Sequence, residues 1–592
     1  MRFQPPRFIS RPRANDAAVH QQEQEDLEKK NAPEVSSAAA SELNHPVPEE
    51  EGVQRIEALT SSWTWRELIL TYLAIYLFFF IHDLQQSIVG TCAPYIASAL
   101  GDHHSLVAAI QIAALIIGGV VSFPIARVLD IWGRLPGFVM LFILTEVGMI
   151  MMAGALTIQT YAAAQVFYWI GQNGTSLSLQ VFLADTSTLK NRAIVYAFTT
   201  SPYIMTQFVG PLAATNFLTK YGPSGIRWGY GTFCIVYPFA AAPVIGTLWY
   251  HMRQTEKKGL MPKRESGRTW MESVKHYVIE FDVVGMILIC AGFVLFLLPF
   301  SLAGDEAGKW NNGSIIAMIV VGGCLLIIFP FYEKFFAPHM LLPWELLKNR
   351  NVWSTCIVAG TLFVSFYCWD AYFYSYLQVV FQQTIQNASY ISSTYTVGSC
   401  FVAFIVGALI HVSNYFKWIA LFAIPLQILG TGLMIHFRQP DQHIGYVVMC
   451  QIFIAFSGGA MSLLDEISVM AGTSHDKVAI VLALLNVATQ VGGAIGLSIS
   501  GAIWTNSMPE ALMKFLPADA QKDFASIYGS ITTQLSYPMG SPVRVAIIKS
   551  YALAQRRMTI AATCVLVLAL FGVLMWRNIN ISRVHQTKGT VF

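Results

Sequence analysis

The chain has 592 residues, of which 55% are hydrophobic and only 12% are charged. Soluble proteins carry about 25% charged residues, so this composition excludes an ordinary water-soluble domain. The formal net charge of +3 is too small to indicate a nucleic-acid partner. Apolar runs of about 20 residues recur along the chain, and each is long enough to cross about 30 Å of hydrocarbon.

The segment before the first apolar run, residues 1–60, is polar and rich in Gln, Glu, Ala and Pro. It begins with several arginines but has no apolar stretch of the kind found in a signal peptide. A segment of this composition buries too little apolar surface to fold alone. We therefore expect a disordered cytoplasmic tail, with the first spanning helix acting as the insertion signal.

Fourteen apolar segments predict spanning helices, because a helix pairs its own backbone groups in lipid. The predicted spans are 67–93, 106–128, 136–157, 160–184, 193–217, 229–250, 283–303, 313–335, 352–379, 390–411, 416–437, 444–471, 478–506 and 557–576. The predicted units are an N-terminal six-helix bundle (61–250), a cytoplasmic linker (251–281), two additional helices with the following cytoplasmic loop (282–351), a C-terminal six-helix bundle (352–577) and a cytoplasmic tail (578–592). The fold class is therefore an all-α membrane protein.

Basic residues gather in alternate loops, which predicts the orientation of the chain. The basic residues of the predicted inner loops are Arg134, Lys190, Arg192, Arg253, Lys257, Lys258, Lys263, Arg264, Arg268, Lys275, Lys334, Lys348, Arg350, Lys417 and Lys477. This positive-inside asymmetry holds with an even number of spans and both termini in the cytoplasm. The exception is a long outer loop, 507–552, which either folds over the outer mouth with Tyr528 and Tyr537 or is a solvated connector.

The chain has no sequence pattern typical of an enzyme. Its nine cysteines stand singly in or beside apolar runs, without the spacing of a zinc site or a disulfide framework. There is no P-loop motif, so ATP hydrolysis is not expected to drive the protein. We expect no metal site and no cofactor, which leaves an ion gradient as the source of energy for transport.

The loop between the second and third spans carries the first motif. Residues 126–134 read ARVLDIWGR, which resembles the signature G-x-x-x-D-x-x-G-R-[RK] of the major facilitator superfamily. Asp130, Gly133 and Arg134 match it, whereas the first glycine and the last basic residue are replaced. The resemblance implies a conformational latch that closes the inner side, in which Arg134 pairs with Asp185 and Asp130 meets the positive end of a helix dipole.

Four further stretches resemble the fungal siderophore–iron transporter family, the fourteen-helix branch of that superfamily. They are residues 52–58, 184–193, 198–204 and 536–556, and they occur in the family's order. The resemblance implies a monomeric importer of ferric siderophores, mostly hydroxamates, by proton symport at the plasma membrane or a vesicle membrane. Haem or glutathione is the alternative cargo. The other alternative is a drug or toxin antiporter, whose span-five motif is only partly matched by Gly210 and Pro211.

Ionisable residues inside spans are costly and are therefore functional candidates. The candidates for proton coupling are Asp83, Glu146, Asp370, Asp465 and Glu466. Because neighbours on a helix diverge by about 100°, we expect at most one of the adjacent acidic pair in the twelfth span to face a cavity. For each carboxylate, the alternative is a structural hydrogen bond to its helix neighbours.

A bulky chelate whose iron charge is balanced by its ligand needs aromatic faces and hydroxyl donors. The ninth span supplies such a cluster around Asp370, and two residues of the fifth and twelfth spans are further candidates. The candidates for substrate binding are Tyr203, Trp369, Tyr372, Tyr374, Tyr376 and Gln451. The alternative for the aromatic cluster is packing together with an interfacial aromatic belt.

Overall fold

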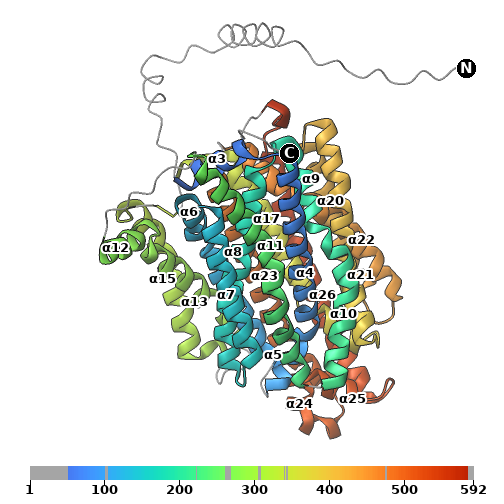
Figure 1. The fold of residues 1–592 in the computed structure, drawn as a ribbon. Helices are drawn as coiled ribbons and strands as arrows, with labels where there is room; N and C mark the ends of the chain where they lie inside the picture. The colour runs from blue at the N-terminus through green and yellow to red at the C-terminus, as the bar shows by residue number, and fades with distance from the viewer. Residues whose placement is uncertain are drawn as a thin grey trace, which may run out of the picture. The chain divides into compact units, whose positions relative to one another are not determined.

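The computed structural model describes residues 51–100, 104–221, 223–259, 269–303, 309–338, 340–341, 344–473 and 477–583. The chain separates into two compact units, 1–49 and 50–592, and every described residue lies in the second. Within these ranges all regular elements are helices (Figure 1). Most of the predicted tail 1–60 lies outside the described residues, but its last part forms a helix.

The helices up to the linker, α3 to α11, form the N-terminal half. The elements are α3 Glu51–Ser62, α4 Trp65–Leu100, α5 His104–Val120, α6 Ser122–Trp132, α7 Arg134–Gly154, α8 Ile158–Asp185, α9 Leu189–Thr200, α10 Pro202–Tyr221 and α11 Pro223–Lys257. The chain between this half and the next two spans is not irregular throughout, since part of it is helical. The connecting elements are α12 Trp270–Glu280, α13 Val283–Leu297, α14 Pro299–Leu302, η1 Lys309–Asn311, α15 Gly313–Phe335 and α16 Trp344–Lys348.

The remaining helices form the C-terminal half. The elements are α17 Arg350–Asp370, α18 Phe373–Val379, α19 Ile385–Ser392, α20 Thr394–Ser413, α21 Lys417–Phe437, α22 Ile444–Ala471, α23 Val478–Phe515, η3 Ala518–Asp523, α24 Phe524–Gly529, α25 Ile531–Ser536, α26 Pro542–Met575 and η4 Ile581–Arg583. The predicted loop 507–552 is therefore shorter, because its first part continues α23 and its last part begins α26. The last helix starts at Pro542, not near the predicted residue 557.

Each half packs chiefly on itself, and a few helices join the two. In the N-terminal half α7 packs on α8 and α4 on α10 and α11, while in the C-terminal half α17 packs on α23 and α26. The halves meet where α5 and α6 contact α23 and where α9 and α10 contact α20. The two additional helices attach to this seam through α13 and α14, which contact both α5 and α23.

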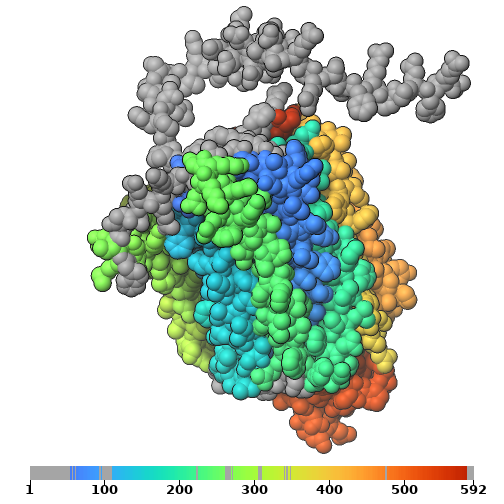
Figure 2. Space-filling model, viewed as in Figure 1, coloured from blue at the N-terminus to red at the C-terminus, as the bar shows by residue number. Residues whose placement is uncertain are grey.

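Twelve of the described helical segments are long and apolar enough to cross a membrane. They match twelve of the predicted spans. The other two, 160–184 and 193–217, correspond to α8 and to the pair α9–α10, which are helical but carry more polar residues. A count of fourteen spans therefore stays a prediction. The outward faces of the bundle carry many large exposed apolar side chains, as expected of surfaces that face lipid, and Figure 2 shows one such face with α4, α7, α10 and α11 towards the viewer.

Candidate functional site

A cavity of about 220 Å³ lies between the two halves. Helices α4, α8, α9 and α10 line it from the N-terminal half, and α22 lines it from the C-terminal half. The lining residues are Phe79, His82, Asp83, Gln86, Ser176, Gln180, Tyr196, Thr199, Thr200, Tyr203, Ser462, Leu463 and Glu466. No lysine or arginine is among these described lining residues, so the cavity is polar with an acidic bias.

Asp83 occupies the middle of α4 and is only 1% exposed. Its Oδ1 lies 3.0 Å from Nδ1 of His82, whose side chain is 4% exposed. The second carboxylate oxygen, Oδ2, accepts no hydrogen bond from the described residues. Leaving a buried acceptor unpaired costs about 1–3 kcal/mol. This oxygen is therefore a place where a proton or a donor group from a ligand would be bound favourably.

Tyr203 is the second residue of α10 and lines the cavity. Pro202 has no backbone N–H and begins α10, so Ser201 stands between α9 and α10. The Tyr203 hydroxyl donates to Oε1 of Gln86 at 2.8 Å. Tyr203 and Asp83 both line this cavity.

The adjacent acidic residues of α22 point in different directions. Glu466 lines the cavity, and its Oε1 accepts a hydrogen bond from Nε2 of Gln180 at 3.3 Å, which joins α22 to α8 across the two halves. Asp465 is 5% exposed and is not a lining residue. It lies towards Cys356 of α17, inside the C-terminal half. The cavity thus carries one carboxylate from each half.

The halves touch on both sides of this cavity along the helices. On one side the Tyr95 hydroxyl donates to Oε1 of Gln378 at 2.9 Å. Tyr95 lies about 18 Å from Asp83 along α4, since the helix rises about 1.5 Å per residue. On the other side, about one turn before the lining residue Tyr196 in α9, Nη1 of Arg192 donates to Sδ of Met470 at 3.3 Å. The cavity is thus bracketed by contacts between the halves, and a large cargo needs one set of contacts to part.

The signature loop forms a buried ionic cluster. Nε of Arg134 donates to Oδ2 of Asp185 at 2.8 Å, and its Nη1 donates to Oδ1 of Asp130 at 2.9 Å and to the Leu129 carbonyl at 2.8 Å. Gly133, between α6 and α7, has φ +96°, a backbone conformation that side chains other than glycine strain to adopt. All these groups belong to the N-terminal half. The ion pairs therefore join α6, α7 and α8 within one half and do not themselves cross between the halves.

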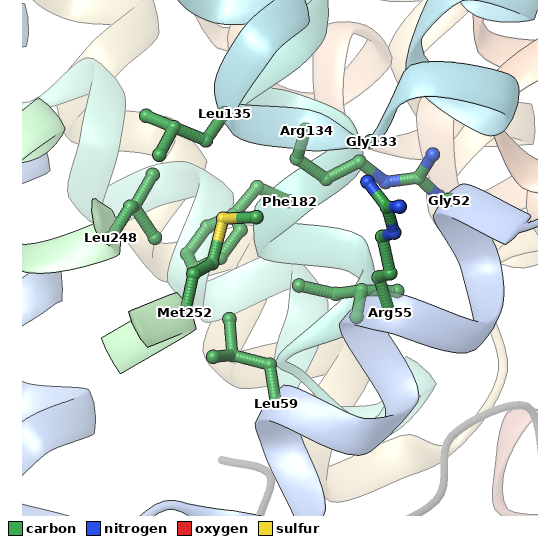
Figure 3. A pocket seen from close by; sticks show the side chains of 10 residues that line it. Gly52, Arg55, Leu59, Gly133, Arg134, Leu135, Phe182, Leu248 and Met252 are labelled. Atoms are coloured by element: carbon green, nitrogen blue, oxygen red, sulfur yellow. The ribbon is translucent and has the colours of Figure 1, made fainter. Parts of the chain in front are cut away.

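Helix α3, which the composition assigned to the tail, covers this cluster. Gly52 packs directly on the Asp130 backbone, so that a side chain there would collide with the Asp130 carbonyl. Figure 3 shows Arg55 of α3 extending towards Gly133 and Arg134 at a cavity of about 20 Å³, which is space for about one water molecule. The start of the folded chain thus rests on the signature turn.

The aromatic cluster of the ninth predicted span lies apart from the central cavity. Helix α17 ends at Asp370 and α18 begins at Phe373, and the rings around this break pack on one another. Tyr372 stacks on Trp504 with ring centroids 4.2 Å apart, and Trp369 and Tyr376 are fully buried. None of these rings lines the cavity, so this arrangement favours packing over a role in binding cargo.

Hydrogen bonds hold the same region together. The Tyr376 hydroxyl donates to the Arg438 carbonyl at 3.0 Å, and the Tyr374 hydroxyl donates to the Ile385 carbonyl at 3.2 Å. Nη1 of Arg438 donates to the Trp369 carbonyl at 2.8 Å, at the end of α17. Burial lowers the pKa of the Arg438 guanidinium to about 10. Its charge lies over the Phe373 ring, 4.2 Å from the centroid, and is retained at neutral pH.

The other predicted site residues also stand away from the cavity. Glu146 is half-buried in α7, and its Oε1 has no hydrogen-bond partner among the described residues. Gln451 is fully buried in α22, and neither its side-chain nitrogen nor its side-chain oxygen has a hydrogen-bond partner among the described residues. Asp370 is half-buried at the end of α17. The structure therefore brings only Asp83, Tyr203 and Glu466 of the predicted coupling and binding residues to one place.

The segment 516–541 between α23 and α26, which the sequence analysis predicted as part of an outer loop and which is called the outer segment below, is pinned to the C-terminal half by a buried arginine. Arg544 is 2% exposed and donates to the carbonyls of Gln534 and Val379. The Tyr551 hydroxyl donates to Oε1 of Gln534 at 2.8 Å. Tyr528 stacks on Phe524, while Tyr537 is half-buried. This segment is folded rather than a loose connector, and neither tyrosine reaches the central cavity.

Several lining residues were missed by the sequence analysis, although a signal for them exists. His82 and Gln86 are four residues apart in α4, and Ser176 and Gln180 are four apart in α8. Residues at this spacing share one face of a helix. Polar side chains repeated at that spacing inside an apolar span therefore predict a polar cavity, even without an ionisable group.

Comparisons with known proteins agree with this geometry. The sequence model of the Major Facilitator Superfamily matches residues 75–497. An Ajellomyces capsulatus protein named MFS siderochrome iron transporter 1 is 46% identical over 543 residues, covering 92% of each chain. MFS siderochrome iron transporter D of Aspergillus fumigatus is 44% identical and covers 92% of this chain and 90% of its own. Siderophore iron transporter mirB of Emericella nidulans is 41% identical, covering 91% and 89%.

Among solved structures, the fold is similar to a bacterial homologue of the human lysosomal transporter Spinster in an inward-facing, unoccupied conformation. The TM-score is 0.52 at 15% identity, covering 87% of this chain and 98% of the other. At that identity the likeness shows the fold alone. Together with the signature loop and the two packed halves, the sequence matches show that the chain belongs to the major facilitator superfamily and, within it, to the family of fungal siderophore iron transporters.

Proposed function

We propose that the chain imports ferric siderophores of the hydroxamate type by proton symport, at the plasma membrane or a vesicle membrane. In this proposal Asp83 is the carboxylate that gains and loses the coupled proton. The observation that carries it is the cavity between the halves with a buried carboxylate whose Oδ2 is unpaired. The names of the curated relatives support the class of cargo.

The chemistry of the cavity suits a chelate with little net charge. The described lining has hydroxyl and amide donors from Tyr203, Gln86 and Gln180 but no lysine or arginine that would hold a strongly anionic cargo. A ferric hydroxamate has its iron charge largely balanced by the ligand, so hydrogen bonds and an aromatic face are sufficient. The cargo's iron is substrate and needs no ligand from the protein.

The size of the cavity indicates how cargo and proton are linked. Pockets for drug-sized ligands have about 300–1,000 Å³, whereas this one has about 220 Å³. A siderophore therefore needs the halves to part further than they do in the arrangement described here. An ionised carboxylate that is only 1% exposed is costly, so protonation of Asp83 would favour passage through this compact arrangement.

The energy available is sufficient for symport. A thousandfold accumulation of a neutral cargo costs about 4.1 kcal/mol, at about 1.4 kcal/mol per decade. One proton releases about 2.3 kcal/mol per 100 mV of membrane potential. A pH difference of one unit adds about 1.4 kcal/mol per proton. One or two protons for each cargo molecule would therefore drive concentrative uptake.

The test is uptake of radio-iron-labelled ferric siderophores by cells that express the chain, with and without a protonophore. We expect uptake that the protonophore abolishes, and little uptake of haem or glutathione. Asp83→Asn should lower concentrative uptake at least about tenfold yet retain exchange of labelled for unlabelled cargo, because exchange needs no net proton movement. Exchange also shows that the variant is folded and binds cargo.

The matched control is Asp465→Asn, the same chemical change at a buried carboxylate of α22 that does not line the cavity. It should retain concentrative uptake. Accumulation by Asp83→Asn at the wild-type level would remove Asp83 from the proton pathway. Uptake that ignores the protonophore would refute proton symport, and net export of a xenobiotic in place of iron uptake would identify an antiporter.

A further inference from the structure

Helix α12 presents an apolar stripe that no described part of the protein covers. Met271 is 74% exposed, Val274 is 45% and Val278 is 46%. At 100° per residue these positions fall within about 60° of one another around the helix. Glu272 and Lys275 are exposed on the neighbouring side. The helix therefore has an apolar face and a charged face side by side, which is typical of a helix lying in a membrane surface.

A third face of α12 packs on the bundle, and this contact determines which way the apolar stripe faces. The Tyr277 hydroxyl accepts a hydrogen bond from Nε1 of Trp132 at 2.9 Å, and the two rings meet edge to face with centroids 5.3 Å apart. Tyr277 also stacks on Phe281. Trp132 is the last residue of α6 and precedes Gly133, so α12 is anchored beside the signature turn.

The position of α12 along the chain places it at the boundary of the hydrocarbon. Asp282, two residues after the end of α12, has a left-handed backbone conformation with φ +40°. The chain therefore changes direction there, before the spanning helix α13 begins at Val283. The first exposed residues of α13, Val284 and Ile287, belong to its lipid-facing side. In Figure 1 α12 lies at the left edge, near the end of the bundle where α3 lies. The stripe thus lies only a few residues before a spanning helix with exposed apolar side chains.

Charge identifies the kind of lipid. The segment 251–281 contains seven lysine and arginine residues against four glutamates. Helix α12 itself carries one lysine and two glutamates, so the positive excess lies in the stretch of chain that leads into it. Each basic residue near an anionic membrane surface contributes about 1 kcal/mol of attraction. We propose that α12 is an interfacial helix that inserts Met271, Val274 and Val278 at the level of the lipid headgroups and binds anionic phospholipid, on the side predicted to be cytoplasmic. Because Tyr277 of α12 is hydrogen-bonded to Trp132, the residue before Gly133, lipid bound by α12 would lie beside the signature turn.

The test uses the full chain in nanodiscs that contain a trace of phosphatidylserine or phosphatidylcholine with a photoreactive group at headgroup level. Adducts are mapped by mass spectrometry to the peptide that contains α12. We expect the phosphatidylserine probe to label this peptide several-fold more than the phosphatidylcholine probe. Val274→Glu and Met271→Glu should each lower labelling several-fold, because a carboxylate resists insertion and repels an anionic headgroup.

The matched control is Ile279→Glu, the same kind of change at an apolar residue that is 37% exposed on the charged side of the helix. It should retain most of the labelling. Equal labelling of all three variants, no labelling of α12, or cross-links from α12 to a second copy of the chain would overturn the proposal. The assay contains no siderophore and measures no transport, so its result is independent of the proposed function.

Discussion

Arg134→Lys is the perturbation for which the structure gives the sharpest expectation. The guanidinium makes three hydrogen bonds inside the protein, two of them to the buried carboxylates of Asp130 and Asp185. A lysine ammonium at the end of a flexible chain cannot meet both carboxylates in the geometry of the planar fork. Hydrogen bonds to charged groups are each worth about 1.5–3 kcal/mol, so the loss of one of them lowers stability by about that amount.

Arg134→Ala removes the cation that forms ion pairs with both of these carboxylates. Asp130 and Asp185 are 6% and 4% exposed, so neither is solvated once the arginine is gone. Breaking a buried ion pair by removing one partner costs about 3–5 kcal/mol. The alanine variant should therefore be less stable than the lysine variant, and both should be less stable than wild type.

The assay is thermal inactivation of the purified protein in detergent, followed by loss of the monodisperse peak in size-exclusion chromatography. Large membrane proteins commonly unfold irreversibly, so the half-life at fixed temperature is compared rather than an equilibrium free energy. Arg556→Lys is the matched control, because Arg556 is exposed on α26. If Arg134→Lys inactivates no faster than Arg556→Lys, the stabilising role assigned to the ionic cluster is refuted.

Three other predictions follow from packing and hydrogen bonds. Gly492→Ala should destabilise the protein by about 1–3 kcal/mol in the same assay, because a Cβ there meets the Gly360 carbonyl, whereas Gly246→Ala has open space and should be neutral. Arg544→Ala should expose the outer segment to limited proteolysis several-fold faster, and an unchanged cleavage rate would contradict the pinning contact. Tyr203→Phe removes the donor to α4 and should weaken the apparent affinity for cargo severalfold without lowering stability; unchanged affinity would remove this hydroxyl from cargo binding.

The class of protein and most helices follow from the sequence because the bilayer imposes them. A run of about 20 apolar residues has one stable conformation in hydrocarbon, and its ends are marked by charge. The same reasoning explains where the prediction was less accurate. The predicted tail and the predicted loop 507–552 contain α3 and the first turns of α26, where polar residues leave hydropathy with little signal.

The residues of the ionic cluster could also be predicted from the sequence. Asp130, Gly133 and Arg134 lie close together in the chain, and their roles depend on a short turn whose geometry glycine determines. Asp185 was named as the partner from family resemblance, and the structure places it 2.8 Å from Arg134. Packing, in contrast, decided that the cluster stays within the N-terminal half and that α3 covers it.

Which buried polar residues meet at the cavity was decided only by the tertiary structure. The sequence supplied five carboxylates in spans, and nothing local separates Asp465 from Glu466, since both lie in one uniformly apolar helix. In lipid, an apolar side chain has a similar free energy against a neighbouring helix and against hydrocarbon, so hydrophobicity does not determine which face of a span points inward. The packing of the helices places Tyr203 and Glu466 at the cavity with Asp83 and leaves the aromatic cluster around Trp369 buried in its own half.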